Sequence, residues 1–402
     1  MKLAIVAPGI WGTVHLELAR TLARLGQQVV VYTEDGRAPS GWHFTRFSEE
    51  GVAFWVISDT RRAAPVWLLD RLGKPWLGRR FFTSLFAVRR FLKAQRDCDI
   101  ALVEGDWIGL FVALARRGLP LRWVVGIHDT LYLRIPIDYP GRPRSRWREM
   151  AKRWVLDQAT SVRANSFVTR DALVQGGCDP EKIFVLPLHR PAWMAIPNGD
   201  LEDYRRLARD DIRSRWSVPA AASLAIVMCR LDAVKGLELA VDAVAAGPGH
   251  CWLLICGGDR RVAGMGSYRA ALEARAMRLG IAGRVVFAGA IDKLQVARHL
   301  AAADVHLAPS VIDTYNYSVV EATFVGTPSL MSETVGAGPW VVEAGGGEIV
   351  ATRSPPAWGE RLGQRLAHPP TGQARREAAD KLAAITHPER IANALLAALQ
   401  AR

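Results

Sequence analysis

The chain has 402 residues, half of them hydrophobic, and a formal net charge of +13 at pH 7. This length exceeds one ordinary hydrophobic core and predicts two domains of about 200 residues each. The charge predicts a polyanionic neighbour such as nucleic acid, anionic lipid or a phosphorylated substrate. The five cysteines are odd in number and lack metal-site spacing. We therefore expect buried free thiols in a reducing compartment.

No window of the sequence approaches the roughly 18 uninterrupted apolar residues of a membrane span. The first residues, MKLAIVAPGIWG, carry one lysine and a short apolar run that Pro8 interrupts. This pattern is typical of a β-strand and not of a signal peptide. We expect a cytoplasmic protein, or one bound peripherally to the inner face of the membrane.

Residues 1–33 predict a strand, a glycine loop, a helix and a second strand, and hence a right-handed parallel sheet. The loop reads GIWGT, and its Gly9 and Gly12 do not form the GxGxxG pattern of a dinucleotide-binding fold. Because Glu34 and Asp35 follow the second strand, a nicotinamide-dependent oxidoreductase stays open as an alternative.

Residues 61–96 combine basic and aromatic side chains, with eight Arg and two Lys against one acid, Asp70. From Arg79 onward the pattern predicts a basic amphipathic helix with an apolar face formed by Phe82, Leu85, Phe86 and Phe91. Such a helix suits an anionic membrane surface, at about 1 kcal/mol per basic residue. The alternative is a core helix with solvated arginines. Residues 141–154 are also basic, and no nucleic-acid-binding module is visible.

Two further predicted strands, in DIALVEGDW and RWVVGIHDT, end in polar residues. His128 ends the second one, at the edge where α/β sheets bind their ligands. It is a candidate site residue, with a purely structural histidine as the alternative. The proline-rich stretch HRPAWMAIPNGD that follows is the best candidate for a linker.

The second half of the chain begins with a strand that leads to Arg230 and then to Lys235, before a helix. Two cations five positions apart in a strand-to-helix loop predict a diphosphate clamp. The next strand ends at Gly257 and Gly258, where backbone can approach a ligand closely. A third strand leads into a loop at Ile291.

The stretch 303–347 predicts a strand, a polar loop, a helix and another strand. The loop carries Asp313, Asn316 and Ser318, and Glu321 follows in the helix. Unpaired N–H groups at a helix N-terminus above a sheet favour an anion. The two carboxylates would hold hydroxyl groups on either side of a bound phosphate. Alternatively, Asp313 begins a turn and Glu321 is a solvated helix residue.

This stretch resembles the family 4 glycosyltransferases of the GT-B fold. Their signature is a glutamate, seven residues and a second glutamate, then a helix and Gly-x-Pro. Here it reads Asp313, TYNYSVV, Glu321 and Gly326-Thr327-Pro328. Asp replaces the first glutamate and Asn316 replaces a glycine, although Asn tolerates the left-handed backbone that glycine allows. The resemblance covers nearly the whole chain, including the N-terminal glycine loop, the strand-end histidine and the Arg…Lys-Gly element.

The resemblance implies an α/β protein with two Rossmann-like parallel-sheet domains facing a central cleft and a C-terminal helix that crosses back to the first domain. The implied parts are an acceptor-binding domain, a linker with a connecting helix, a nucleotide-sugar-binding domain and the returning helix, at 1–190, 191–222, 223–385 and 386–402.

The implied activity is retaining, metal-independent hexosyl transfer from a UDP- or GDP-sugar, which is a substrate and not a cofactor. The acceptor would be a glycan or lipid-linked saccharide, as in polysaccharide or lipopolysaccharide biosynthesis. Arg230 and Lys235 would stabilise the departing diphosphate, and Asp313 and His128 would contact the donor sugar. The other implied donor-binding residues are Glu321 at the ribose, Gly12, Gly257, Gly258, Asn316, Tyr317, Ser318 and Ile291. A catalytically silent GT-B binding protein and a GT-B nucleotide-sugar epimerase are the alternatives.

Overall fold

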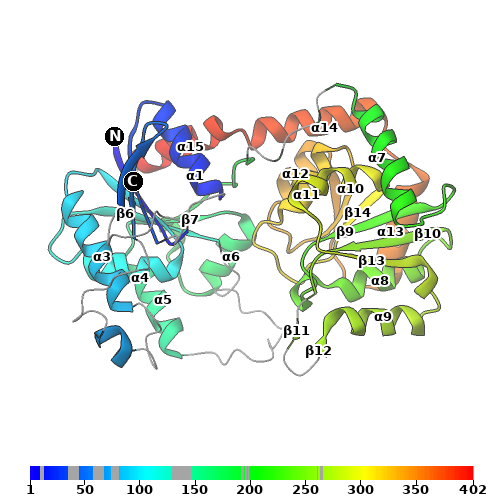
Figure 1. Cartoon of the computed structure of the whole chain (residues 1–402), viewed down its shortest axis with the longest axis horizontal. Coiled ribbons are helices and arrows are strands. Elements are labelled where there is room, and N and C mark those ends of the chain that lie inside the picture. Colours follow the sequence, from blue (N-terminus) through cyan, green and yellow to red (C-terminus); the bar gives the residue numbers. More distant parts are fainter. Residues whose placement is uncertain are drawn as a thin grey trace. The chain divides into compact units, whose positions relative to one another are not determined.

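The computed structural model describes residues 1–9, 13–34, 45–57, 68–73, 81–128, 146–191, 199–259 and 266–401, with residues 194, 197, 261 and 262. These residues form two compact units (Figure 1). The first unit contains residues 1–128, 146–191 and 387–401, and the second contains residues 194–386.

The first unit is built on one sheet with the strand order β3-β4-β2-β1-β5-β6-β7-β8. Its strands are β1 (Lys2–Ala7), β2 (Gln28–Thr33), β3 (Thr45–Glu49), β4 (Val52–Val56), β5 (Ile100–Glu104), β6 (Arg122–Ile127), β7 (Ser161–Ala164) and β8 (Ile183–Val185). Neighbours are parallel except β3 and β4. A tight turn at Glu50 and Gly51, both with positive φ, joins this antiparallel pair. The expected parallel sheet therefore has an antiparallel edge.

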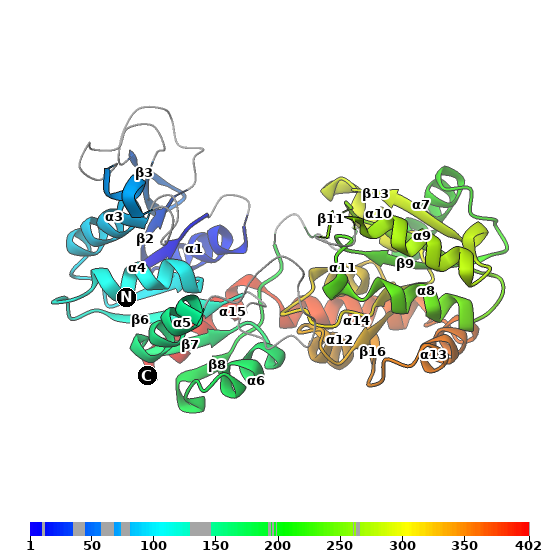
Figure 2. The ribbon, with the colours of Figure 1, turned by 90° about the horizontal axis from the view of Figure 1, so that it is seen from below.

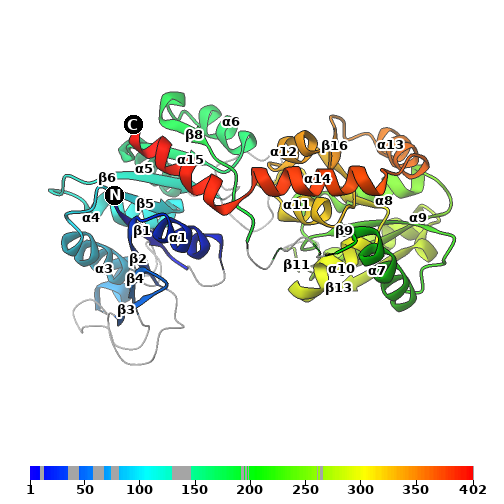
Figure 3. The same ribbon diagram turned by 90° about the horizontal axis from the view of Figure 1, so that it is seen from above.

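Alternate residues of each strand point to opposite faces of this sheet, as the two-residue period of a strand requires. Leu3 and Ile5 pack on one face with α1 (Val14–Arg24) and α15 (Pro388–Gln400). Ala4 and Val6 pack on the other face, under α3 (Phe81–Ala94), α4 (Asp106–Ala115) and α5 (Arg146–Gln158). Figure 3 shows α15 beside α1. The prediction that the last helix returns to the first domain is confirmed.

Helix α3 differs from the predicted amphipathic helix. Its buried residues are Phe81, Ser84, Ala87, Val88, Phe91 and Leu92. Phe86, which was expected on the apolar face with Phe91, is instead 47% exposed. The buried face of this helix contains small residues as well as phenylalanines, so the positions of the aromatic residues did not identify the buried face. The predicted basic helix is therefore a core helix of this unit, and residues 61–67 and 74–80 of the basic segment lie outside the described residues.

The second unit has a parallel sheet with the strand order β13-β10-β9-β14-β15-β16. Its strands are β9 (Ser223–Met228), β10 (Cys251–Cys256), β13 (Val285–Gly289), β14 (Val305–Ala308), β15 (Ser329–Ser332) and β16 (Gly347–Val350). On one face pack α8 (Leu237–Ala246), α9 (Tyr268–Arg278) and α13 (Pro355–Ala367) (Figure 2). On the other face pack α7 (Leu201–Arg215), α10 (Val296–Ala302) and α11 (Tyr317–Phe324).

Helix α7 falls in the range expected to form the linker, yet it belongs to the core of the second unit. Its Ala208 and Ile212 are buried against Leu224 and Ile226 of β9. Its Arg213 donates to Asp304, and Arg205 donates to the backbone carbonyl of Ala303. These buried contacts fix the helix to the sheet.

The cysteines are all free thiols, and four of the five are buried, as the sequence predicted. Burial raises the pKa of the Cys98 thiol to about 11 and the pKa of the Cys229 and Cys251 thiols to about 12, and it also raises the pKa of Cys178 and Cys256. Within the described parts of the chain, no helix combines the length and the apolar character that a membrane crossing needs.

Candidate functional site

The second unit has a point where the direction of strand addition reverses, and this point lies between β9 and β14. From β9 the chain adds β10 and β13 on one side, and it then returns to add β14, β15 and β16 on the other. Ligands of such sheets bind outside the carboxyl ends of the strands at this reversal. A hollow lies there, formed by the ends of both strands together with Lys235, Asn316 and Ser318.

The loop after β9 is held against the loop after β14. Val311 N–H donates to the carbonyl of Val234 at 2.8 Å. Gly236 has a left-handed backbone with φ of 62°, and a Cβ at this position would lie 2.2 Å from the carbonyl oxygen of Pro309. The glycine that follows Lys235 therefore allows the two loops to touch, and their contact sets the position of the lysine.

Lys235 and Asp313 form an ion pair at this hollow, with Nζ 2.5 Å from Oδ2. Their side chains are 17% and 10% exposed, so the pair is largely shielded from water. The backbone of Asp313 is also fixed, because its N–H donates to Thr334 and its carbonyl accepts from Gly336. The structure thus brings together two predicted site residues that the resemblance assigned to different parts of the donor.

Asn316 forms the N-cap of α11. Its backbone is left-handed, with φ of 69°, which confirms the expectation that Asn can hold the conformation of the family's glycine. Its side-chain oxygen accepts from the N–H of Ser318 at 3.1 Å and from the Ser318 hydroxyl at 2.6 Å. The positive end of the α11 dipole is therefore aimed into the same hollow as Lys235.

Glu321 lies on α11, one turn beyond Tyr317. Burial raises the pKa of its carboxyl group to about 7, and nearby Lys293 lowers it by a smaller amount. A carboxyl group with this pKa changes its charge near neutral pH. Its interaction with any hydroxyl group will therefore depend on pH in that range.

The other predicted residues of the second unit are not among those that line this hollow. Arg230 follows β9 and is exposed, while Ile291 and Tyr317 are half-buried. A Cβ on Gly257 would lie 1.7 Å from the carbonyl oxygen of Cys229, so this position requires glycine for close strand packing. The carbonyl of Gly258 accepts from Leu231 N–H at 3.0 Å and ties the β10 loop to the β9 loop.

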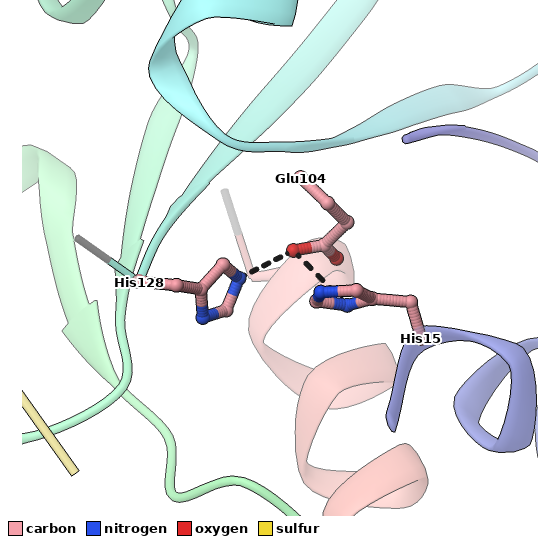
Figure 4. Close-up of side chains that lie close together, drawn as sticks. All are labelled: His15, Glu104 and His128. Carbon is pink, nitrogen blue, oxygen red and sulfur yellow. Dashed lines mark hydrogen bonds and ion pairs between the residues drawn. The ribbon is translucent and has the colours of Figure 1, made fainter. Parts of the chain in front are cut away.

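The first unit has its own reversal point, between β1 and β5, and a polar cluster lies there. His15 comes from the start of α1, Glu104 from the end of β5, and His128 follows β6 (Figure 4). Glu104 Oε2 lies 2.7 Å from His128 Nε2 and 3.6 Å from His15 Nδ1. Gly12 of the preceding loop lies outside the described residues.

Arg163 on β7 completes this cluster, with Nη2 2.7 Å from Glu104 Oε2. Burial by itself would raise the pKa of Glu104, but Arg163, His15 and His128 outweigh it and hold that pKa below its usual range. Burial lowers the pKa of His15 to about 3, so its ring is neutral at physiological pH. The cluster therefore contains one buried ion pair with two imidazole rings beside its carboxylate.

Two family models match this chain and cover most of it. Residues 10–189 match the glycosyl transferase 4-like domain, and residues 208–382 match the glycosyl transferases group 1. The chain belongs to the family 4 glycosyltransferases. The two matched segments agree with the two units of the fold, and the signature stretch at Asp313 and Glu321 lies inside the second match.

Several curated relatives of this glycosyltransferase have names that include an inositol compound. The D-inositol 3-phosphate glycosyltransferase of Corynebacterium urealyticum is 27% identical over 87% of this chain and 80% of its own length. The chain spans 59% of the enzyme of that name from Xylanimonas cellulosilytica, at 26% identity over 61% of this chain. A GDP-mannose-dependent phosphatidylinositol dimannoside mannosyltransferase of Mycobacterium tuberculosis is 37% identical over 35% of each chain.

Solved structures share the GT-B fold of this glycosyltransferase. Sucrose-phosphate synthase of Thermosynechococcus elongatus superposes with a TM-score of 0.73 at 18% identity, over 100% of this chain and 98% of that one. The HepE protein of Anabaena in complex with UDP and glucose superposes with a TM-score of 0.67 at 17% identity, over 100% of each chain.

The cluster of the first unit has residue types that can bind a metal ion. The ligand atoms of His15, Glu104 and His128 lie within 4.8 Å of one another. However, the Arg163 guanidinium lies 2.7 Å from Glu104 Oε2 and 3.3 Å from His128 Nε2. A fixed cation at this distance repels a second cation. The donor set therefore fits a hydrogen-bonded cluster better than a metal centre.

Sequence reasoning named His128 in this cluster but did not assign roles to Glu104 and Arg163. Glu104 ends a buried strand, which is the same signal that singled out His128. That signal, applied to every strand end of the first half, would have found the carboxylate. Arg163 lies inside a short strand and gives no comparable signal.

Proposed function

We propose that this glycosyltransferase transfers a hexosyl group from a UDP- or GDP-sugar, with retention of anomeric configuration and without a metal ion. The proposal rests chiefly on the Lys235–Asp313 pair beside the α11 N-terminus, at the reversal point of the second unit. A diphosphate accepts hydrogen bonds and is attracted to a positive charge such as the lysine ammonium group. A sugar donates hydrogen bonds from its hydroxyl groups to a carboxylate.

The positive groups at this hollow support leaving-group stabilisation. Lys235, the exposed Arg230 and the N–H groups at the start of α11 come from the loops after β9 and β14. Negative charge on the diphosphate grows as the glycosidic bond breaks, so these groups bind the transition state more tightly than the ground state. They supply the positive charge that a metal ion provides in other transferases, which supports metal independence.

Retention is what the family resemblance implies, and the state of Asp313, the predicted carboxylate nearest to this charge, bears on the route by which it would occur. A nucleophilic carboxylate must be free to attack the anomeric carbon, whereas Asp313 is held by Lys235 and by a fixed backbone. Departure and attack on the same face of the sugar therefore fit better than a covalent intermediate. His128, as the family resemblance implies, would contact the donor sugar.

The acceptor in this proposal is a glycan or lipid-linked saccharide, bound by the first unit at the cytoplasmic face of a membrane. The first unit exposes large apolar side chains on α4 and α5, including Trp107 (40%), Trp147 (43%) and Met150 (73%). The two indole rings are 6.2 Å apart and form one patch, and Met150, three positions after Trp147, lies on the same face of α5. Indole rings favour the membrane interface, and the net charge of +13 favours anionic lipid.

A binding panel tests the donor. We expect UDP or GDP, at 100 times its Kd, to add about 2.7 kcal/mol of apparent stability. We expect Arg230→Ala and Lys235→Ala each to weaken that binding at least about tenfold, since each removes a charge-assisted contact. NMR of the first-formed product in the presence of EDTA then reports configuration and metal dependence. Stabilisation by NAD and not by nucleoside diphosphates would contradict the proposal, as would unchanged binding by both variants.

Vesicle sedimentation tests the membrane assignment. We expect the protein to bind vesicles with 30% anionic lipid, and to be released at about 1 M salt because surface charges are then screened. Met150→Ser should reduce binding. Met277→Ser on α9 of the second unit is the matched control, because Met277 is also highly accessible, at 64% exposed. An equal loss of vesicle binding in both variants, or vesicle binding that does not depend on salt concentration, would contradict the assignment.

A further inference from the structure

Glu104 is a carboxylate buried more deeply than an acid usually lies, with a side chain that is 2% exposed. Burying a charge is unfavourable unless partners replace its water. Its partners come from separate elements: Arg163 on β7, His128 after β6 and His15 on α1. The ion pair with Arg163 already neutralises the charge, so the two imidazole rings are additional to what burial requires.

The backbone makes room for this arrangement at one position. Gly126 of β6 lies opposite Glu104 of β5 in the sheet register. A Cβ at Gly126 would lie 2.5 Å from Glu104 Oε2, 3.0 Å from His128 Nε2 and 3.1 Å from Arg163 Nη2. Any other residue would displace the carboxylate, the imidazole or the guanidinium. The absence of a side chain at Gly126 therefore allows all three groups to meet.

The contact determines which nitrogen of His128 carries a proton. An ionised carboxylate accepts hydrogen bonds and donates none. The guanidinium of Arg163 only donates as well, but it already donates to Glu104 Oε2 at 2.7 Å and lies farther, at 3.3 Å, from His128 Nε2. At 2.7 Å from Glu104 Oε2, Nε2 of His128 must therefore be the N–H donor. In the neutral ring, Nδ1 is then the atom with the lone pair.

We propose that Glu104 is a positioning residue that fixes His128 as the Nε2–H tautomer and fixes the plane of its ring. Nδ1 then acts as a hydrogen-bond acceptor for a hydroxyl group of the sugar. Arg163 keeps Glu104 ionised, and His15, which is 16% exposed, packs at 5.0 Å from the His128 ring and limits its rotation. This inference rests on the proposed contact between His128 and the donor sugar, but the tautomer itself can be measured without any reaction.

The first experiment records ring-nitrogen chemical shifts of His128 in the unmodified protein, by long-range proton–nitrogen correlation at pH 7.5. We expect an Nε2 shift typical of a protonated nitrogen and an Nδ1 shift typical of an unprotonated one. The signals are assigned by their loss in His128→Gln. A predominantly Nδ1–H ring would overturn the inference, whatever the activity of the enzyme.

The second experiment compares Glu104→Gln with Glu49→Gln, which alters an exposed carboxylate of the same unit that also pairs with an arginine. We expect Glu104→Gln to mix the two tautomers and to lower kcat at least about tenfold, because the ring is then no longer held in one orientation toward the sugar. Kd for the nucleoside diphosphate should not change, and Glu49→Gln should match the unmodified protein. Unaltered ring shifts together with unaltered kcat in Glu104→Gln would overturn the inference.

A variant that fails to fold would still leave the inference testable. Glu104→Asp keeps the charge beside Arg163 but shortens the reach to His128, so the ring should again show mixed tautomers. A retained single tautomer in Glu104→Asp, with kcat lowered as in Glu104→Gln, would overturn the role in fixing the proton. If the unmodified protein shows the expected tautomer but transfers no sugar, the proposed function is contradicted and the tautomer assignment stands.

Discussion

Lys235 and Asp313 neutralise each other's charge where they meet, and this pairing decides how each can act on a donor. A diphosphate that binds Lys235 must compete with Asp313 for the ammonium group. Removing the carboxylate should therefore strengthen the binding of a nucleoside diphosphate that carries no sugar, while removing the lysine should weaken it.

We predict that Asp313→Asn raises the affinity for free UDP or GDP by about three- to tenfold, because a partly shielded ion pair contributes roughly 1 kcal/mol. The same variant should lower kcat, since the contact with the sugar is lost. Isothermal titration measures the affinity. Asp242→Asn removes an ion pair with Arg275 on α8 and α9, and it is the control that should leave the affinity unchanged. Weaker binding of the free nucleotide by Asp313→Asn would contradict competition.

Glu321 predicts a pH dependence of donor binding. Its folded pKa of about 7 is raised by burial, so the carboxyl group is mostly protonated at pH 6 and mostly ionised at pH 8. An ionised carboxylate accepts from ribose hydroxyls, so the affinity should rise about tenfold from pH 6 to pH 8, with proton release on binding. Glu321→Gln should flatten this rise. Titrations in buffers of different ionisation enthalpy count the protons, and proton uptake would contradict the role.

At the scale of elements, the contact between the β9 and β14 loops shows why Lys235 is followed by glycine. We predict that Gly236→Ala lowers the free energy of unfolding by several kcal/mol and weakens nucleotide binding. Alanine at this position would be strained by the left-handed backbone, at a cost of about 1 kcal/mol, and its Cβ would clash with the carbonyl oxygen of Pro309. Gly280→Ala is the matched control, because Gly280 has φ of 70° but no atom within 4 Å of an added Cβ. Urea unfolding should separate the two variants, and equal losses would exclude the clash.

Local elements were predicted well wherever a residue pattern and a conformational requirement agreed. The α11 loop is one example, because Asn316 both tolerates positive φ and caps the helix that follows. Helix α3 is a counterexample, since its buried face includes Ser84 and Ala87 while Phe86 faces solvent. Aromatic residues can lie on the buried or the exposed face of a helix, so their spacing does not identify the core face.

At the scale of the molecule, the chain length predicted two domains and the alternation of strands and helices predicted parallel sheets, while the family resemblance implied the return of the last helix. It did not predict the Glu104 cluster, which joins residues from four elements between positions 15 and 163. Long-range contacts of this kind depend on which residues of neighbouring strands lie opposite each other, and the residue pattern of a single sequence does not reveal this register. The fold was therefore more predictable than the partners of its polar residues.

Because α15 completes the first unit from the far end of the chain, the two units should respond differently to core substitutions. Leu395 of α15 and Leu382 of α14 (Gly372–Ile385) are both fully buried, in the first and second unit respectively. Either leucine-to-alanine change should cost about 2–5 kcal/mol, through lost apolar contact and the cavity left behind.

We predict that Leu395→Ala increases amide hydrogen exchange in β1 and α1, while Leu382→Ala increases it in the second unit and leaves β1 protected. Mass spectrometry of peptides from each unit makes the comparison within a single sample. Because exchange from core strands reports the stability of the cooperative unit that contains them, each variant locates the boundary of its own unit. Equal loss of protection in both units for both variants would mean that the chain unfolds as one cooperative body, in spite of its two cores.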